Sequence, residues 1–347
     1  MSSLLSRRGF GAGLLGAGLA GWSSGARAAG LLAQAAPAAQ PRFFRIGTGS
    51  TSGTYFPIGT LLGSVISKPA GSRDCERGGS CGVEGLIAAA QATNGSVDNV
   101  RGIAAGTLES GLCQANIAYW AYTGTRNFDG QRPLEELRAI ASLYRESIHL
   151  VVRAESAIRS VRDLRGRRVA VGDRGSGTLV DTLFLLDAFG LKESDLLARY
   201  LMPGPAADAL ARNEIDCFSI IAGFPTAAVQ DLAEQVPIRL LSLSDGDGDA
   251  FVRSHPFFAF TRIPEGTYKD VPAAETLSVG AQWLTSSRRS AELIHGILTA
   301  LWHPSSRRIL DSGHPEGRNI RLETALSGLA IPLHEGAERF YREKGML

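Results

Sequence analysis

The feature that most constrains the fold is a strand, loop and helix pattern that occurs twice. In the first copy, the compact apolar run 43–46 is followed by a loop rich in glycine, serine and threonine, 47–55. Apolar residues then recur at the spacing of one helix face, at Ile58, Leu61, Leu62, Val65 and Ile66. The pattern predicts a buried strand that leads through a glycine-rich turn into an amphipathic helix.

The second copy lies in the middle of the chain. A short strand is predicted at 168–172, a loop of glycine and hydroxyl residues at 173–178, and a helix that ends near Gly190. Both copies continue alike. The first has a predicted helix at 97–105 and then a buried strand at 111–114, and the second has a helix at 206–212 and then a buried strand at 217–223. The next helices are predicted to begin at Asn116 and Pro225. The sequence therefore predicts two similar α/β units.

Two such units favour a ligand cleft between two lobes. Ligands of open parallel sheets bind at the carboxyl ends of the strands. Glycine lets the backbone approach a ligand, and the N–H groups of helix N-termini attract anions. We predict an α/β fold in which lobe 1 comprises 43–145 plus 252–347 and lobe 2 comprises 146–251. The chain is expected to cross from lobe 1 to lobe 2 at 144–146, between strands 138–143 and 149–153. It is expected to return to lobe 1 after a strand at 238–243 and a polar loop at 244–249.

The first 28 residues read as an export signal. Arg7 and Arg8 precede a weakly apolar, glycine-rich run at 11–22, and Ala26 and Ala28 offer the small residues at which a signal peptidase cleaves. We predict a twin-arginine signal peptide over 1–28 and a periplasmic protein. The run is too short to stay in a bilayer as an anchor. The net charge of +2 gives no case for nucleic-acid binding.

Four cysteines fit an oxidising compartment. Cys75 and Cys81 lie in a polar, glycine-rich insert at 71–82, where a disulfide closing a small loop is expected. A metal site is the alternative, but neither histidine nor a third cysteine lies nearby in the sequence, and zinc usually takes four ligands. Cys113 and Cys217 occur in apolar runs and read as buried thiols. The six histidines show no metal spacing.

Five segments, in order, resemble a known family. The loop at 46–57 closely resembles the opening motif of the TAXI proteins, the solute receptors of one class of tripartite (TRAP) transporters. Further similarity follows at 95–100, 114–119, 172–178 and 222–230. The resemblance runs from about Phe43 to the C-terminus.

The resemblance implies a type II periplasmic binding-protein fold that performs no chemistry and takes no cofactor or metal. It implies a monomer that binds an organic anion, such as glutamate or 2-oxoglutarate, and delivers it to TRAP membrane subunits. Carried onto this chain, the ligand-binding residues are Ser50, Thr51, Gly53, Thr54, Tyr55, Ser96, Gln114, Asn116, Ser176, Gly177, Thr178, Gly223 and Pro225. Asn116 and Phe56 depart from the residues expected there, which leaves the solute open.

Other interpretations of the glycine loops are weaker. A dinucleotide site would need a shorter glycine spacing and an acidic residue about 20 positions on, which the chain lacks. A nucleophile elbow would need serine where Thr51 stands. A structural turn without ligand, a ligand sensor for a histidine kinase and an exported enzyme stay open. Arg101, Arg126 and Arg145 are candidates for clamping a carboxylate, although a surface role is expected for each.

Overall fold

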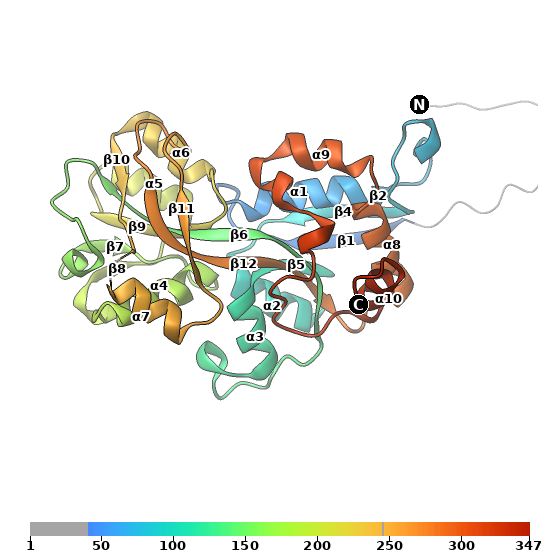
Figure 1. The fold of residues 1–347 in the computed structure, drawn as a ribbon, viewed down its shortest axis with the longest axis horizontal. Helices are drawn as coiled ribbons and strands as arrows, with labels where there is room; N and C mark the ends of the chain where they lie inside the picture. Colours follow the sequence, from blue (N-terminus) through green and yellow to red (C-terminus); the bar gives the residue numbers. More distant parts are fainter. Residues whose placement is uncertain (1–40, 245) are drawn as a thin grey trace, which may run out of the picture. The chain divides into compact units, whose positions relative to one another are not determined.

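The computed structural model describes residues 41–244 and 246–347, and these belong to one compact unit (Figure 1). The predicted signal peptide, with Arg7, Arg8 and Ala28, lies outside the described residues. Within the described part of the chain, every helix is too short or too polar to cross a membrane.

A single ten-stranded sheet runs through this unit. Its main path is, in order, β4 (Leu86–Gln91), β1 (Arg42–Gly47), β5 (Ser110–Gln114), β12 (Ala274–Ser286), β6 (Leu137–Arg153), β9 (Cys217–Ala222), β7 (Arg168–Ala170) and β8 (Leu197–Arg199). Two strands pair off this path: β10 (Ile238–Leu240) with β6, and β11 (Ala259–Ile263) with β12. A separate short pair consists of β2 (Ser67–Lys68) and β3 (Val83–Glu84).

Strand direction divides the sheet into two similar ends. The pairs β4–β1, β1–β5, β8–β7 and β7–β9 are parallel. The pairs that join the ends, β5–β12, β12–β6 and β6–β9, are antiparallel. Long strands β6 and β12 pass between the ends, as Figure 1 shows. Parallel strands need helical crossovers, so each end repeats strand and helix in alternation.

The helices are α1 (Tyr55–Ile66), α2 (Ser96–Ala105), α3 (Ala115–Thr123), α4 (Gly177–Ala188), α5 (Pro203–Ala211), α6 (Ala227–Gln235), α7 (Gly246–Ser254), α8 (Ala291–Leu301), α9 (Ser306–Gly313) and α10 (Glu335–Glu343). We call the segment from β1 to α3 the first half-unit and the segment from β7 to α6 the second half-unit. Their chain orders correspond: β1, α1, β4, α2, β5, α3 and β7, α4, β8, α5, β9, α6. The predicted repeat of α/β units is confirmed.

The predicted break at 144–146 was wrong, because β6 is one strand of 17 residues. Arg145 and Glu146 continue the pairing with Gly280 and Val279 of β12, and Ser147 pairs with Ala222 of β9. Polar residues in the middle of this strand resembled a turn in the sequence. In the structure, backbone pairing with β12 holds Arg145 and Glu146 in an extended conformation.

Two further boundaries differ from expectation. Helix α6 begins at Ala227, two residues after Pro225, because Thr226 is extended, with φ −116°, and its Oγ1 donates to the Ser52 carbonyl instead of capping the helix. The polar run expected to be a loop at 244–249 contains the start of α7. That helix forms because it buries the apolar side chain of Phe251.

The buried apolar side chains form four clusters. One joins Trp283 of β12 to residues of α1, α8 and α10, on the side of the first half-unit. On the side of the second half-unit, Phe251, Leu277 and Val279 pack with β7, β9 and α4. The lobe limits predicted from the sequence stay a prediction, and from this packing we propose that the chain returns to lobe 1 within β12.

The cysteine insert is closed by the predicted Cys75–Cys81 disulfide, with a Cα–Cα distance of 4.7 Å. His303, which is remote in the sequence, lies beside it, with its Nε2 3.9 Å from the Cys75 Sγ. Cys113 and Cys217 are free and buried, as predicted.

Candidate functional site

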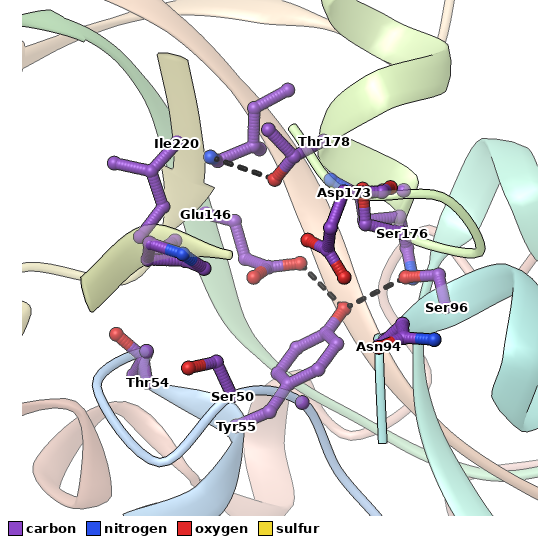
Figure 2. Close-up of a pocket in the computed structure, with 18 residues that line it drawn as sticks. Ser50, Thr54, Tyr55, Asn94, Ser96, Glu146, Asp173, Ser176, Thr178 and Ile220 are labelled. Atoms are coloured by element: carbon purple, nitrogen blue, oxygen red, sulfur yellow. Dashed lines mark hydrogen bonds between the residues drawn. The ribbon is translucent and has the colours of Figure 1, made fainter. Parts of the chain in front are cut away.

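A small cavity of about 60 Å³ lies where the strands of both half-units end. Figure 2 shows its 18 lining residues. They are Gly49, Ser50, Gly53, Thr54, Tyr55, Asn94, Gly95, Ser96, Gln114, Glu146, Asp173, Ser176, Gly177, Thr178, Pro203, Ile220, Ile221 and Ala222. Both glycine-rich loops contribute to the wall. The cavity therefore occupies the place where ligands bind in open α/β sheets.

Four helices begin at the cavity wall. Tyr55, Ser96 and Gly177 are the first residues of α1, α2 and α4, and Gln114 immediately precedes α3. A side-chain cap occurs only at α4 among the four, where Ser176 Oγ accepts a hydrogen bond from the Leu179 N–H at 3.0 Å. Helix N-termini carry partial positive charge and free N–H groups. Their convergence makes the cavity suitable for an anion.

Local sequence explains why these helices start where they do. Gly95 has φ +118°, a conformation that only glycine adopts readily, and it turns the chain into α2. Ser96 then accepts a hydrogen bond on its Oγ from the Gln114 N–H at 3.1 Å, which ties α2 to the end of β5. In the second half-unit, Ser176 caps α4 after Gly175, which has φ +90°. Glycine and hydroxyl residues thus have separate tasks in each loop.

Direct hydrogen bonds join the two half-units beside the cavity. Thr54 Oγ1 donates to the Gly223 carbonyl at 2.7 Å. The Ser52 carbonyl accepts from Thr226 Oγ1 at 3.1 Å and from the Ala228 N–H at 3.0 Å. Tyr55 OH donates to Glu146 Oε2 on the shared strand β6 at 2.6 Å and lies 3.5 Å from Ser96 Oγ (Figure 2). The first loop therefore contacts the opposite wall, and the two half-units are joined beside the cavity in this arrangement.

Two carboxyl groups face this cavity. Burial raises the pKa of Glu146 well above its usual range, the negative charges of Asp181 and Glu316 raise it further, and only the Tyr55 hydrogen bond opposes them. Burial, with a smaller contribution from Asp98, raises the pKa of Asp173 to about 6. Both groups therefore favour the neutral form more than an exposed carboxyl does.

Two acceptor atoms at the wall have no hydrogen-bond partner. They are Gln114 Oε1 and Asp173 Oδ2, on side chains that are 2% and 9% exposed. A buried polar atom without a partner costs stability, so such atoms indicate positions that a bound solute or water satisfies.

None of the 18 lining residues is lysine, arginine or histidine. The arginines considered as clamps lie elsewhere. Arg101 and Arg126 sit over the rings of Phe128 and Phe184, and Arg145 Nε donates to Ser278 Oγ. Positive potential in the cavity therefore comes from helix N-termini rather than from side-chain cations.

The cavity brings together nine of the thirteen predicted ligand-binding residues: Ser50, Gly53, Thr54, Tyr55, Ser96, Gln114, Ser176, Gly177 and Thr178. The other four are placed differently. Thr51 is exposed on the outer side of its loop. Asn116 is fully buried beside the cavity, where its Nδ2 donates to Asp181 Oδ1 of α4 at 2.6 Å. Gly223 and Pro225 lie behind Ala222, and the Gly223 carbonyl accepts from Thr54.

Sequence reasoning missed Glu146 and Asp173. Glu146 was assigned to a turn, although a lone carboxyl between the apolar runs of one long strand would have been a signal. Asp173 directly follows the predicted strand of the second loop, and its position at the strand end was visible in the sequence. Asn94 and Pro203 were also missed, and nothing in their local pattern distinguishes them.

The fold and the chain are similar to known proteins. Residues 46–345 match the model of the NMT1-like family. Among solved structures, PhnD1 from Prochlorococcus marinus in complex with methylphosphonate is 11% identical, with a TM-score of 0.50, covering 89% of this chain and 100% of that chain. The periplasmic aliphatic sulphonate binding protein SsuA from Escherichia coli is 16% identical, with a TM-score of 0.42 and 88% of each chain covered.

These comparisons bear on the predictions to different degrees. The mixed α/β fold with a central sheet is that of two-lobed periplasmic binding proteins, so the predicted fold is confirmed. The narrower resemblance to TAXI receptors of TRAP transporters finds no support in the matched family or in these structures, and it stays a prediction.

Proposed function

Because this chain belongs to the NMT1-like family and has a binding-protein fold, we propose that it is a periplasmic receptor for a small organic anion. The observation that carries the proposal is the convergence of four helix N-termini on one cavity. Their N–H groups suit an oxyanion. The hydroxyl groups of Ser50, Ser96 and Thr178 add neutral hydrogen-bonding groups to the wall.

The hydrogen bonds between the half-units support a hinged closure. The bonds from Thr54 to Gly223 and from Ser52 to Thr226 and Ala228 must break before a solute enters from that side. We propose that the half-units move apart around β6 and β12, the strands they share, and close over the solute. Affinity then depends on how well the solute supports the closed form.

Within this proposal, acidic amino acids and dicarboxylates or oxo acids, such as glutamate and 2-oxoglutarate, are the first solutes to test. The receptor delivers its solute to the membrane subunits of a transporter. The resemblance of the first loop to TAXI receptors favours TRAP subunits. A chromosomal neighbour that encodes a transport ATPase would favour the ABC class instead.

The proposal is tested by calorimetry on the mature protein after unfolding and refolding to remove any solute that copurifies. The panel contains glutamate, 2-oxoglutarate, glutarate, ethanesulfonate and methylphosphonate, the last because PhnD1 was solved with it. We expect at least one to bind with a Kd in the micromolar range or below. Absence of binding by every member would overturn the proposal.

A matched pair of variants places the binding in this cavity. Tyr55→Phe removes a hydroxyl at the wall, and Tyr341→Phe removes one that donates to the Ile140 carbonyl in the core. Tyr55 OH holds Glu146 at the wall through a hydrogen bond that contributes about 1 kcal/mol, so Tyr55→Phe should weaken solute binding by roughly fivefold to tenfold. Tyr341→Phe should lower stability and leave the Kd unchanged. Equal Kd values for both variants would place the binding elsewhere.

A further inference from the structure

The cavity combines features that require opposite charges in a solute. Helix N-termini at its wall favour an anion, yet Glu146 and Asp173 also face it. No side-chain cation among the 18 lining residues compensates these carboxyls. A buried charge without a partner is costly, so either a proton or a cationic part of the solute must neutralise them.

Among the described residues, neither the cavity wall nor the groups whose charges act on Glu146 include a cation. Its side chain is 2% exposed. The ionisable groups near it are Tyr55 of α1, Cys113 of β5, Tyr144 of β6, Asp181 of α4 and Glu316, in addition to Asp173 across the cavity. Each of these is neutral or negative. In this arrangement, burial without a cationic partner favours the protonated form of the carboxyl.

Hydrogen bonding fixes where that proton lies. Glu146 Oε2 accepts the hydrogen of Tyr55 OH at 2.6 Å. A neutral carboxyl has one O–H, so the proton belongs on Oε1. In this form Glu146 donates a hydrogen bond to an anion, whereas its ionised form repels one. The same side chain thus changes from a barrier to a binding group when it takes up a proton.

We propose, on the basis of the function proposed above, that the cleft binds its solute together with a proton carried by Glu146. The solute class is then an organic anion without an ammonium group, such as a dicarboxylate, an oxo acid or an oxyanion of sulfur or phosphorus. Opening the cleft admits water to Glu146 and favours its ionisation. Closing over the anion takes the proton up again.

A solute with an ammonium group would give the opposite linkage. Its positive charge would pair with ionised Glu146, and binding would release a proton from the site. The sign of the proton exchange therefore separates the two solute classes. Glutarate and glutamate, which differ by the amine, are the natural pair for comparison.

The test measures proton uptake by calorimetry of the tightest-binding panel member in two buffers with different ionisation enthalpies. We expect net uptake at neutral pH, and a Kd that rises up to about tenfold per pH unit where one full proton is taken up. Glu146→Gln, which imitates the protonated group, should bind without this uptake and with a nearly constant Kd. Uptake of zero, release of protons, or uptake that Glu146→Gln leaves unchanged would overturn the proposal.

A matched control is Glu316→Gln. Glu316 is also buried, but both of its oxygens accept hydrogen bonds, from the Phe224 N–H at 3.1 Å and from Asn319 Nδ2 at 2.7 Å. It does not line the cavity. This variant should keep the proton uptake of the wild type. Loss of uptake in both variants to the same extent would show a general effect of buried carboxyls and contradict the specific role of Glu146.

Infrared spectroscopy provides a readout that needs no solute. Because opening favours ionisation of Glu146, the solute-free wild type should gain the carbonyl band of a protonated carboxyl as the pH is lowered, a band that Glu146→Gln lacks, and solute addition at pH 7 should strengthen it. Failure of the whole panel to bind would defeat the proposed function, and this band would still decide the state of Glu146. Absence of the band both before and after solute addition would overturn the inference.

Discussion

The two half-units have the same order of strands and helices but use their loops differently. In the first half-unit, the loop before α1 has no side-chain cap and no carboxyl, and it hydrogen-bonds to the opposite half-unit through Ser52 and Thr54. In the second, the loop before α4 is capped by Ser176, whose Oγ also donates to the Asp173 carbonyl. The first loop makes three hydrogen bonds to the opposite half-unit, whereas the second accepts one, from the Asp98 N–H to the Gly175 carbonyl at 3.0 Å, and presents a carboxyl.

The difference shows that a repeated sequence pattern need not repeat a role. Both loops place glycine and hydroxyl residues at helix N-termini, which is enough to build a wall that attracts anions. Contacts beyond the loop then decide how strongly it is bonded to the opposite half-unit. Substitutions in corresponding positions can separate these roles.

The largest effect on stability is expected from a substitution at Gly172. It has φ +105°, and a Cβ there would lie 2.7 Å from the backbone nitrogen of Leu179. Gly172→Ala combines backbone strain with a clash against the helix start, and should lower the free energy of unfolding by about 2–4 kcal/mol. Chemical denaturation measures this difference.

Gly49 in the first loop is the matched control. A Cβ at this position would meet Tyr55 at 3.7 Å, an ordinary contact. Gly49→Ala should change the free energy of unfolding by less than about 0.5 kcal/mol. Equal losses of unfolding free energy for the two variants would contradict the stricter backbone requirement at Gly172.

A smaller effect concerns pH and Asp173. The folded protein raises the pKa of this carboxyl to about 6, so it binds a proton more tightly folded than unfolded. Its contribution is therefore most favourable below pH 4 and is lost as the pH rises through 6. Asp173→Asn should match the wild type in stability near pH 4 and exceed it by up to about 2 kcal/mol at pH 7.

Unfolding curves at a series of pH values test the Asp173 prediction. The first loop, 47–55, has no carboxyl, so Ser50→Asn should not alter the pH dependence of stability. A stability difference between the wild type and Asp173→Asn that is the same at pH 4 and pH 7 would refute the raised pKa as its cause.

The smallest effect on stability is expected from the helix caps. Ser176→Ala removes the hydrogen bond to the Leu179 N–H and should lower the free energy of unfolding by about 1 kcal/mol.

Thr54→Val removes no cap, because Thr54 Oγ1 donates to the Gly223 carbonyl of the opposite half-unit. It should weaken solute binding severalfold with less effect on stability, since only the closed form has this bond. Calorimetry measures the Kd of both variants and chemical denaturation measures their stability. Equal changes in both quantities for the two variants would contradict different roles for the two loops.

Much of the fold was predictable because its signals are local. The helix predicted at 97–105 lies within one residue of the bounds of α2, and both glycine loops were recognised from their neighbours. The break at 144–146 failed for the opposite reason. Arg145 and Glu146 resemble a turn by themselves, and only pairing with β12, more than a hundred residues away, keeps them extended.

The candidate site also contains residues that local sequence could predict and residues that it could not. Residues next to a helix start, such as Ser50, Ser96 and Ser176, could be named from the loop pattern, and the cavity contains them. Asn116 was named as well, but α4 supplies Asp181 as its partner and removes it from the wall. No local pattern could show that, because the partner lies 65 positions away.

The sequence by itself determined the repeated half-units, the glycine and hydroxyl loops and the helix ends that attract an anion, because these depend on neighbours within a few positions. Tertiary structure decided which groups face one another across the cavity. The Tyr55–Glu146 bond joins residues 91 positions apart, and the Thr54–Gly223 bond joins residues 169 apart. The carboxyls become buried among helix N-termini only when the sheet is assembled, because no single segment of the chain contains all of these groups.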